Sequence, residues 1–498
     1  MSERLLPRPA RVAALAPRRA EDLARLIARV PAGAEAIEYR LDLAAEPIAP
    51  ARLLQSDPRP VIVTYRSSDE GGGFVGGAEE YRRLVAAAYD AGAVVDVELS
   101  SGLLSYPVML PDRRRVVASL HAPFGLPEDW EARLAAMLAT GAAAAKLVAG
   151  AADLAASLRI ADLQRRQTER RVALFPMGPA SAPGRVLSAL FGSALVYGPV
   201  EAPTASGQLP LEELLSVYRV DEPREITSLF GIVGQEVSGS LSPLLHNTLF
   251  RRRGLPALYL PLPVADWERS QAALRQFEPT FRGLSVTRPW KRHAAEAGAL
   301  APDAEATGAA NTLWLERGTW RADNTDVDGI FDPLADHDTG EGRVAVLLGA
   351  GGTCRAAVVA ARRLGYEILV ASRRDAEADA LARELGVDSL AWADVALTEA
   401  DLYVNTTPAG SEPNDPPAVP KAVLESRPLV FDCVYRRDGR ETATIRAARA
   451  AGCRTIDGLS MFAAQAIRQA RIFGVTDARE EEVRAILRGA TDSPEASA

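Results

Sequence analysis

Over the first 210 residues, eight short apolar runs alternate with amphipathic helical stretches, and this alternation constrains the fold most. The expected strands are Val12–Leu15, Ala36–Arg40, Val61–Tyr65, Ala93–Glu98, Arg115–Leu120, Ala142–Val148, Val172–Pro176 and Ala194–Tyr197. Helical patterns separate most of them, at Ala20–Arg29, Ala78–Ala91, Pro127–Ala139 and Ala151–Arg165. Because parallel strands need crossovers and close conveniently at eight, the pattern predicts an α/β fold that begins with a (β/α)8 barrel.

A second alternation of strands and helices follows the charged, proline-containing segment Val217–Thr227, which is typical of a linker. Its expected strands are Ser228–Gly234, Ala257–Pro261, Gly283–Val286, Arg343–Leu348, Glu367–Ala371, Asp401–Asn405 and Leu429–Val434. A helical tail is expected at Ser460–Leu487. With 498 residues and roughly 150 per domain, we expect three domains. They are a barrel at 1–220, an α/β domain at 225–333 that also takes up helices at about 460–490, and a dinucleotide-binding domain at 334–459.

Composition excludes several classes of protein. The balance of 57 basic and 65 acidic residues gives a net charge of −8, whereas a nucleic-acid partner normally requires a basic excess. Three cysteines without a CxxC pair predict neither a disulfide framework nor a metal site. No apolar run reaches the roughly 18 residues of a membrane span. We therefore expect a cytoplasmic protein without membrane or nucleic-acid partners, and the sequence leaves its oligomeric state open.

The segment VAVLLGAGGTCRAAVVAARRLGYEILVASRR has the strand–turn–helix–strand pattern of a dinucleotide site. Gly349 and Gly351 permit the tight turn and close approach of the backbone to a pyrophosphate, and a helix near Thr353 points its amide groups at the phosphates. The second strand ends at Ser372–Arg374 rather than at an acidic residue. Arginines there suit the 2′-phosphate of NADP, so we expect NADP as the cofactor.

Polar clusters precede this segment in places where a core does not need them. They supply Ser240 and Ser242 in SGSLSPLLHN, Thr287 and Lys291 in GLSVTRPWKRH, Asn311 in GAANTLW, and Asn324 and Asp326 in RADNTDVDG. The two serines suit a hydroxylated or carboxylate ligand, but they also suit helix capping. Lys291 and Asp326 suit a general acid–base pair for hydroxyl–ketone chemistry, with a surface salt bridge as the alternative.

Residues 228 to about 475 resemble shikimate dehydrogenase through GIVGQEVSGSLSPLLHN, VTRPWK, GAANT, DNTDVDG, GAGGTCRA, NTTPAG and DGLSMFAAQ. The resemblance implies that Lys291 and Asp326 act at the transferred hydroxyl. The ligand contacts that it implies are Ser240, Ser242, Thr287, Asn311, Tyr435 and Gln465. The implied cofactor contacts are Gly349, Ala350, Gly351, Gly352, Thr353, Ser372, Arg373, Arg374, Cys433 and Gly458. The chain departs from the family pattern at Ser285, Trp290, Ser372 and Cys433.

Candidate functional residues of the predicted barrel lie near the carboxyl ends of its strands, where barrel active sites form. They are Glu38, Arg40, Arg66, Glu70, His121, Lys146, Arg185, Thr204 and Gln208. Lys146 lies within the apolar run AAAAKLVA, so either its tip reaches solvent or its pKa is depressed, as an amine nucleophile requires. His121 is the only histidine of the first 220 residues and is our candidate base, with Glu70 orienting it. Arg185 and Gln208 suit an anionic, hydroxylated ligand.

Residues of about 10 to 215 resemble type I 3-dehydroquinate dehydratase. The matching motifs are ExRxD, the TxR…EGG segment, SxH, the lysine of the sixth strand, MGxxxxxxR and SGQ. The resemblance implies that Lys146 forms a Schiff base, that His121 moves the proton with Glu70 as its partner, and that Arg185 binds the substrate carboxylate. Gly184 and Thr204 each replace a serine that is usual in the family.

Together the two resemblances imply a bifunctional enzyme that dehydrates 3-dehydroquinate and then reduces 3-dehydroshikimate to shikimate with NADPH. Two alternatives stay open from the sequence. In one alternative, the dehydrogenase half acts on quinate with NAD. In the other, the barrel is retained only as a scaffold.

Overall fold

The computed structural model describes residues 5–201, 207–222, 224–277, 280–337, 342–412, 414–436 and 438–491. The chain divides into two compact units. One comprises Met1–Glu225 with Leu262–Thr280, and the other comprises Ile226–Pro261 with Phe281–Ala498. Both units alternate strands and helices, so the expected α/β class is confirmed.

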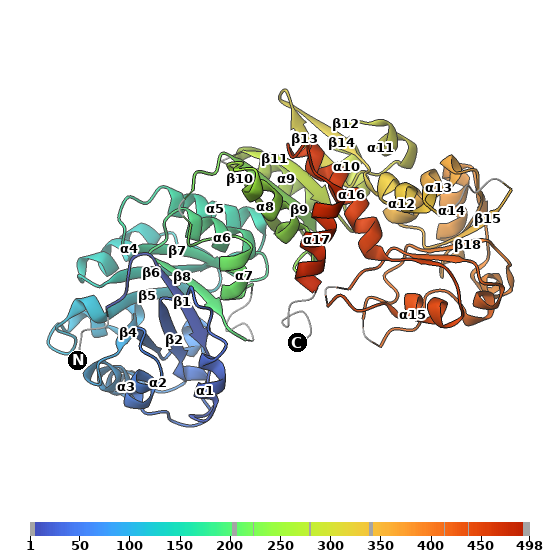
Figure 1. Cartoon of the computed structure of the whole chain (residues 1–498). Helices are drawn as coiled ribbons and strands as arrows, with labels where there is room; N and C mark the ends of the chain where they lie inside the picture. Colours follow the sequence, from blue (N-terminus) through green and yellow to red (C-terminus); the bar gives the residue numbers. More distant parts are fainter. Residues whose placement is uncertain are drawn as a thin grey trace. The chain divides into compact units, whose positions relative to one another are not determined.

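The first unit contains a parallel sheet of eight strands (blue to green in Figure 1). The strands are β1 (Ala10–Leu15), β2 (Ala36–Arg40), β3 (Val61–Thr64), β4 (Val94–Glu98), β5 (Val116–Ala122), β6 (Ala144–Gly150), β7 (Val172–Met177) and β8 (Leu195–Pro199). Their order is β7-β6-β5-β4-β3-β2-β1-β8, and the Ala194 amide donates to the Val172 carbonyl at 2.8 Å where the two ends meet. The sheet is thus a nearly closed barrel, as predicted.

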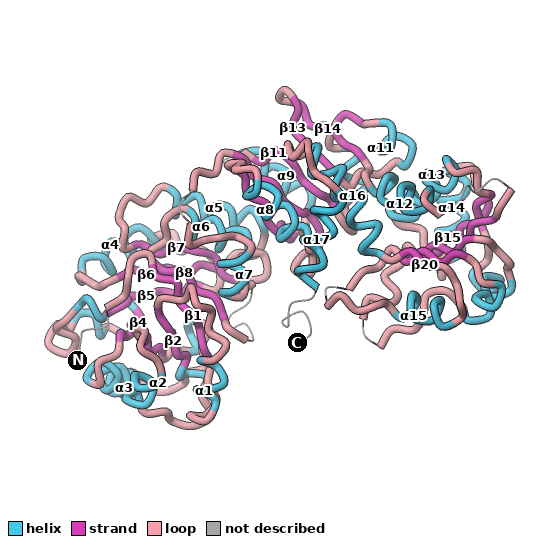
Figure 2. The backbone as a smooth tube through the Cα atoms, in the orientation of Figure 1, coloured by secondary structure: helices cyan, strands magenta, loops and turns pink. Residues whose placement is uncertain are grey.

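Helices surround this barrel (Figure 2). They are α1 (Asp22–Ile27), α2 (Pro50–Ser56), α3 (Ala78–Asp90), α4 (Trp130–Ala139), α5 (Leu154–Arg165), α6 (Ala182–Leu190) and α7 (Leu211–Ser216). The segment between β4 and β5 forms only short 3₁₀ turns, at Leu99–Ser101, Leu103–Ser105 and Arg113–Arg115. Within the first unit, α9 (Trp267–Gln276) contributes Arg269, whose Nε lies 2.9 Å from Asp153 Oδ2 at the start of α5.

Alternation along each strand decides what the barrel interior contains. On β6, Ala144 and Val148 belong to the inner apolar cluster, whereas Ala145 and Leu147 pack outward with the helices. Because successive side chains of a strand point to opposite faces, Lys146 projects into the barrel with its two apolar neighbours. A single strand register thus places the amine inside the barrel, between apolar neighbours of its own strand.

The second unit begins with a six-stranded mixed sheet in the order β10-β9-β11-β13-β14-β12. Its strands are β9 (Ser228–Gly234), β10 (Ala257–Pro263), β11 (Phe281–Val286), β12 (Ala299–Leu300), β13 (Thr312–Glu316) and β14 (Thr319–Asp323). β9 and β11 are parallel, whereas β13 pairs antiparallel with both β11 and β14. The register sets Ser285 opposite Thr312 and brings the segments after β11 and before β13 to one edge.

A second sheet of this unit is entirely parallel, with the order β17-β16-β15-β18-β19-β20. The strands are β15 (Val344–Leu348), β16 (Glu367–Ala371), β17 (Asp388–Ser389), β18 (Leu402–Asn405), β19 (Leu429–Asp432) and β20 (Thr455–Ile456). Numbered along the chain, this order is 3-2-1-4-5-6, which is the Rossmann arrangement predicted for this segment. Strand order reverses between β15 and β18, where such sheets bind their ligands.

Helices cover both sheets of the second unit. They are α8 (Ser242–Arg252), α10 (Lys291–Glu296), α11 (Pro302–Thr307), α12 (Asp326–Ala335), α13 (Gly352–Arg363), α14 (Asp375–Leu385), α15 (Ala443–Ala450), α16 (Gly458–Ile472) and α17 (Glu480–Thr491). The tail expected as helical over Ser460–Leu487 is two helices, because Gly474 adopts a φ of 100° between them. That left-handed conformation ends α16.

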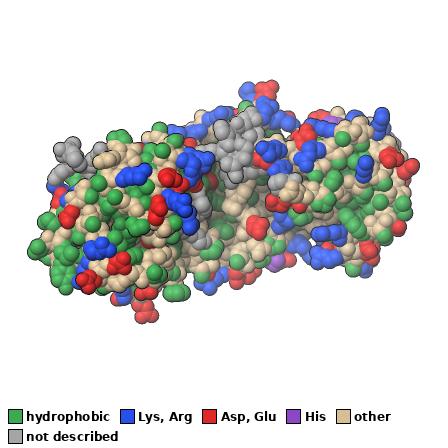
Figure 3. Space-filling model, turned by 90° about the horizontal axis from the view of Figure 1, so that it is seen from below, with side chains coloured by type: hydrophobic (Ala, Val, Ile, Leu, Met, Phe, Trp, Pro, Cys, Tyr) green, Lys and Arg blue, Asp and Glu red, His purple; other side chains and the backbone are tan. Residues whose placement is uncertain are grey.

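On the face drawn in Figure 3, basic and acidic side chains are interspersed. Among the described residues, no helix has the length and apolar character that crossing a membrane requires.

Candidate active sites

Lys146 lies in a cavity of about 50 Å³ inside the barrel, and its side chain is 4% exposed. Its Nζ is 2.5 Å from Asp96 Oδ2 and 3.8 Å from Glu38 Oε1. The ring of Tyr197 lies beneath the amine, with Nζ 4.7 Å from the ring centroid. The alternative in which the lysine tip reaches solvent is therefore wrong. The amine is buried between carboxylates and an aromatic face.

Asp96 and Glu98 are central to this cavity, and neither is among the site residues predicted from the sequence. Both are buried on β4, and the Arg66 guanidinium donates to Asp96 Oδ1 at 2.7 Å and to Glu98 Oε1 at 2.9 Å. Burial opposes the charge of Asp96, yet Lys146 and Arg66 together hold its pKa below the ordinary value. The signal was present in VVDVE, because two carboxylates at alternate positions of an apolar strand face the same side.

His121 and Glu70 meet at the carboxyl end of β5. Glu70 Oε2 lies 3.2 Å from His121 Nδ1 and also accepts from the His121 amide and from Arg66, both at 2.9 Å. Since that oxygen already accepts twice, His121 carries its proton on Nδ1, which leaves Nε2 as a base. Burial, with Arg66 and Lys146 nearby, lowers the His121 pKa well below its usual range. The imidazole is neutral, as a general base requires.

Arg185 supplies a buried cation to the same cavity. Its side chain stacks over Phe175, and no acidic partner for the guanidinium occurs in the described part of the chain. Burial lowers its pKa to about 10. The preceding Gly184 donates its amide to Ser157 Oγ at 3.2 Å, and a Cβ at Gly184 would meet Ser157 O at 2.6 Å. Close packing of α6 on α5 therefore explains the glycine in place of serine.

The other predicted barrel residues divide into three groups. Glu38 and Gln208 line the cavity, and Glu38 accepts from Thr64 Oγ1 at 2.8 Å. Arg40 and Arg66 also line it, but Arg40 donates twice to Asp42 and Arg66 is engaged by three carboxylates. Their charges are thus largely compensated within the chain. Thr204 lies outside the described residues.

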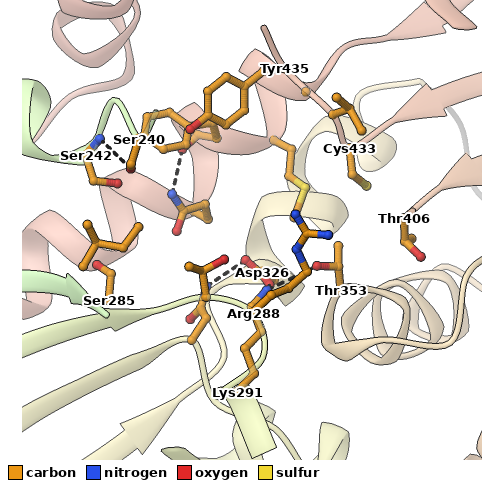
Figure 4. Close-up of a pocket in the computed structure, with 18 of the residues that line it drawn as sticks. Ser240, Ser242, Ser285, Arg288, Lys291, Asp326, Thr353, Thr406, Cys433 and Tyr435 are labelled. Carbon is orange, nitrogen blue, oxygen red and sulfur yellow. Dashed lines mark hydrogen bonds and ion pairs between the residues drawn. The ribbon is translucent and has the colours of Figure 1, made fainter. Parts of the chain in front are cut away.

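In the second unit, Lys291 and Asp326 form an ion pair at the wall of a cavity of about 340 Å³ (Figure 4). Lys291 begins α10 and Asp326 begins α12. Asn311 Nδ2 donates to Asp326 Oδ1 at 2.7 Å, and Lys291 Nζ donates to Thr353 Oγ1 at 3.2 Å. The Thr325 amide donates to Asn311 Oδ1 at 2.8 Å, which fixes the orientation of that side chain.

The structure brings the remaining predicted ligand contacts of this unit to the same cavity. Its lining includes Ser240, Ser242, Thr287, Asn311, Tyr435, Gln465, Thr353, Cys433 and Gly458. In Figure 4, the two serines and Tyr435 lie across the cavity from Lys291 and Thr353. Burial raises the pKa of the Cys433 thiol well above its ordinary range, so the thiol stays uncharged. Gly458 permits a close approach, because a Cβ there would lie 2.3 Å from the Val434 carbonyl.

The glycine-rich turn between β15 and α13 lies at the point where strand order reverses. Gly349 has a φ of 122°, and a Cβ there would meet Thr406 Oγ1 at 2.5 Å. Gly351 caps α13, and a Cβ there would meet nothing within 4 Å, so space above the helix amides is open. A Cβ on Gly352 would lie 2.8 Å from Lys291 Cδ. The loop therefore leaves room for a phosphate and for the lysine stem.

The remaining predicted cofactor residues surround this turn or follow β16. Ala350 lies within the turn, Ser372 is buried directly after β16, and Arg373 is exposed. Arg374 pairs with Glu377 at 2.9 Å.

Several residues at the second cavity were not selected individually from the sequence. They are Ser285, Arg288, Thr406, Thr407, Ser411 and Gln469. Thr406 and Thr407 belong to NTTPAG, a motif that was recognised without assigning its residues. Ser285 accepts from Tyr259 at 2.7 Å and donates to Gln469 at 2.9 Å, so it joins a buried network. Only tertiary contact between β11 and α16 reveals that role.

Comparison with known proteins gives two family matches. Residues 12–225 match the family Type I 3-dehydroquinase, and residues 232–313 match the shikimate dehydrogenase substrate binding domain. The chain is 30% identical over 478 residues to the bifunctional 3-dehydroquinate dehydratase/shikimate dehydrogenase, chloroplastic, of Arabidopsis thaliana, covering 89% of this chain and 78% of that protein.

Other relatives match only the second half. A shikimate dehydrogenase (NADP(+)) of Oleidesulfovibrio alaskensis is 37% identical over 278 residues, which cover 54% of this chain and 98% of that protein. The crystal structure of shikimate 5-dehydrogenase from Thermus thermophilus, in complex with NADP(H) and shikimate, is 30% identical. It covers 53% of this chain and 99% of that one, with a TM-score of 0.47. Because the match to the Arabidopsis protein extends over most of both chains, this chain belongs to the family of bifunctional 3-dehydroquinate dehydratase/shikimate dehydrogenases.

Proposed function

We propose that this chain catalyses two consecutive reactions, namely dehydration of 3-dehydroquinate to 3-dehydroshikimate and reduction of that product to shikimate with NADPH. The observation that carries the proposal is a pair of lysines, each held by an aspartate in a separate cavity. One lies inside the barrel and the other beside the dinucleotide turn. A chain retained as a scaffold has no need for either buried arrangement.

In the barrel, Lys146 is the nucleophile. Its amine adds to the substrate ketone, and loss of water gives a protonated imine, which withdraws electrons and acidifies the neighbouring carbon. Nε2 of the neutral His121 takes the proton from that carbon and returns it to the hydroxyl group that departs as water. Glu70 holds the Nδ1–H side of the ring. Arg185 binds the substrate carboxylate, which is supported by the absence of an acidic partner among the described residues.

In the second unit, Lys291 and Asp326 act at the carbonyl oxygen that becomes the hydroxyl group. Lys291 Nζ offers a positive charge and a proton at that oxygen, while Asp326 holds the ammonium group in place. Asn311 keeps the carboxylate oriented. Ser240, Ser242, Thr287, Tyr435 and Gln465 supply polar groups around the ring of the substrate.

The residues around the dinucleotide turn fit NADP. The open space above Gly351 and the amide groups that begin α13 suit a pyrophosphate. Gly349, Ala350, Gly352, Thr353, Cys433 and Gly458 complete that side of the site in our proposal. Ser372, Arg373 and Arg374 follow β16 with no acidic residue among them, which suits a 2′-phosphate. When bound, NADPH supplies the hydride.

The proposal includes the expected domain division at 1–220, 225–333 with about 460–490, and 334–459. It also includes a cytoplasmic location, which the three free cysteines support because a reducing compartment keeps thiols free. The ligands are the small molecules named above, without nucleic acid or membrane.

A coupled assay tests the two activities. Purified protein is expected to oxidise NADPH when 3-dehydroquinate is added. It is expected to oxidise NADPH equally when 3-dehydroshikimate is added in place of 3-dehydroquinate. Oxidation with 3-dehydroshikimate but not with 3-dehydroquinate would overturn the barrel assignment alone. Initial rates with NADPH and NADH, and with shikimate and quinate in the reverse direction, test the alternative of an NAD-dependent quinate enzyme. We expect NADP and shikimate to give the higher rates.

A further inference from the structure

Tyr197 lies on β8, with its side chain in the barrel cavity beside Lys146. Its ring packs against Phe175, with centroids 6.1 Å apart, and carries the lysine amine above its face. The phenol oxygen is buried and has no hydrogen-bond partner among the described residues of the chain. A buried hydroxyl whose hydrogen bond is not made destabilises the folded chain, so such a group calls for a functional explanation.

The protonation state of Tyr197 restricts what the hydroxyl can do. Burial raises its pKa well above the ordinary value, and the nearby Glu38 and Asp96 act in the same direction, while Arg66 opposes them. The phenol is therefore protonated at any pH at which the enzyme works, and its free hydrogen can only be donated. The neighbouring carboxylates do not take it, because they are engaged by Lys146, Thr64 and Ser119.

We propose that the Tyr197 hydroxyl donates a hydrogen bond to the substrate oxygen that is displaced when Lys146 forms its imine. This inference rests on the proposed dehydratase function and adds a catalytic residue to it. The amine nitrogen forms a bond to the ketone carbon while the carbon–oxygen π bond breaks onto oxygen, and the carbon–oxygen σ bond then breaks as water leaves. The departing water carries the two protons that the lysine ammonium loses in becoming an iminium. Tyr197 stabilises the charge on oxygen and keeps its own proton.

The ring and the hydroxyl of Tyr197 have separable effects. The ring face lies beneath the nitrogen, so it stabilises the positive charge of the iminium as it stabilises the ammonium. A phenylalanine keeps that contact and loses only the donor, whereas a leucine loses both. Tyr39 provides a matched control, because it is a buried tyrosine of β2 whose hydroxyl pairs with Ser56 at 3.0 Å and lies outside the cavity lining.

The experiment compares the full-length chain with Tyr197→Phe, Tyr197→Leu and Tyr39→Phe. Each protein is mixed with 3-dehydroquinate, and borohydride added at short intervals traps the imine on Lys146 for detection by mass spectrometry. We expect Tyr197→Phe to form the trapped imine about a hundredfold to a thousandfold more slowly, the scale for a lost donor at a developing charge. Tyr197→Leu is expected to be slower still, and Tyr39→Phe is expected to match the parent protein.

Two measurements check that each variant is folded. Oxidation of NADPH with 3-dehydroshikimate checks the second unit, and amide hydrogen exchange of β6 checks the barrel.

Trapping by Tyr197→Phe at the rate of the parent protein would overturn the role of the hydroxyl while leaving the dehydratase function intact. Equal slowing by Tyr39→Phe would also overturn it, because a general loss of barrel rigidity would then explain the effect. No trapped imine in the parent protein itself would overturn the proposed function, and the Tyr197 inference with it.

Discussion

The two lysine–aspartate pairs use the same chemical groups in different surroundings. Lys146 and Asp96 are 4% and 0% exposed in a cavity of about 50 Å³, whereas Lys291 and Asp326 are 13% and 8% exposed beside about 340 Å³. Lys146 lies in the middle of a strand, and Lys291 begins a short helix after a turn. The barrel lysine also contacts Glu38 and an aromatic face, while the Lys291 amine pairs with its aspartate and donates to Thr353.

This difference matches the chemical role that we propose for each amine. A lysine that forms a covalent bond must be held in one position, and two carboxylates and an aromatic face hold Lys146 inside its small cavity. A lysine that offers charge and a proton to a substrate oxygen needs space beside it for the substrate and the cofactor together. Covalent and acid–base roles are thus distinguished by enclosure rather than by the identity of the ion pair.

Replacing each lysine gives the largest expected effect. Lys146→Ala is expected to abolish dehydration, with a loss of at least about a thousandfold, and to spare reduction of 3-dehydroshikimate. Lys291→Ala is expected to do the reverse. Each reaction is measured separately in both variants, by formation of the conjugated product and by oxidation of NADPH. A variant that disabled both reactions would contradict the independence of the two sites.

Replacing each aspartate separates catalysis from stability. Asp96→Asn removes the partner of Lys146 and Arg66 in a buried network, so we expect the barrel to lose about 3 kcal/mol of stability as well as activity. Asp326 has one cationic partner among the described residues and lies at the wall of a larger cavity, so Asp326→Asn is expected to cost less stability than Asp96→Asn, while reduction falls about a hundredfold. Amide hydrogen exchange resolves β6 from α12 and measures both stabilities. Equal destabilisation of the two regions would contradict the distinction by enclosure.

Glu70 makes the enclosed site sensitive to pH. Burial raises its pKa to about 7, above the ordinary value of 4.5, although Arg66 acts against this. A folded-state pKa above the unfolded value means that the contribution of Glu70 to stability is greatest below pH 4.5 and is lost as the pH rises through 7. Glu70→Gln is therefore expected to stabilise the barrel at pH 8, by up to about 3 kcal/mol, and to leave it unchanged at pH 4.

Chemical denaturation of Glu70→Gln and the parent protein at both pH values measures this difference. We expect dehydration to slow in the variant, because a neutral amide orients His121 less well than a carboxylate. A stability gain that is the same at pH 4 and pH 8 would show that the ionised carboxylate is not its cause.

The sequence predicted the fold more completely than the sites, and the two sites show why. All eight barrel strands were predicted because apolar alternation is a local property, and the Rossmann segment was predicted from its glycine turn. Lys146, His121 and Lys291 were selected for their unusual local context. Asp96, Tyr197 and Ser285 were not, because a carboxylate, an aromatic ring or a hydroxyl group in a strand acquires its role from strands distant in sequence.

Local geometry at Gly352 gives the smallest expected effect and the sharpest test of how Lys291 is held. A Cβ at this position would lie 2.8 Å from Lys291 Cδ, and that atom belongs to a flexible side chain rather than to the backbone. Gly352→Ala is thus expected to displace the lysine stem without disturbing the fold, and to lower kcat/KM for reduction about tenfold, or about 1.4 kcal/mol.

Gly351→Ala is the matched control for the lysine stem, because no atom lies within 4 Å of its Cβ position. In that control we expect a raised KM for NADPH, since the added methyl group occupies space above the helix amides, with less change in the acid–base step. If Gly352→Ala reduced 3-dehydroshikimate at the parent rate, Lys291 would have room to move, and its position would depend on Asp326 and Thr353 alone.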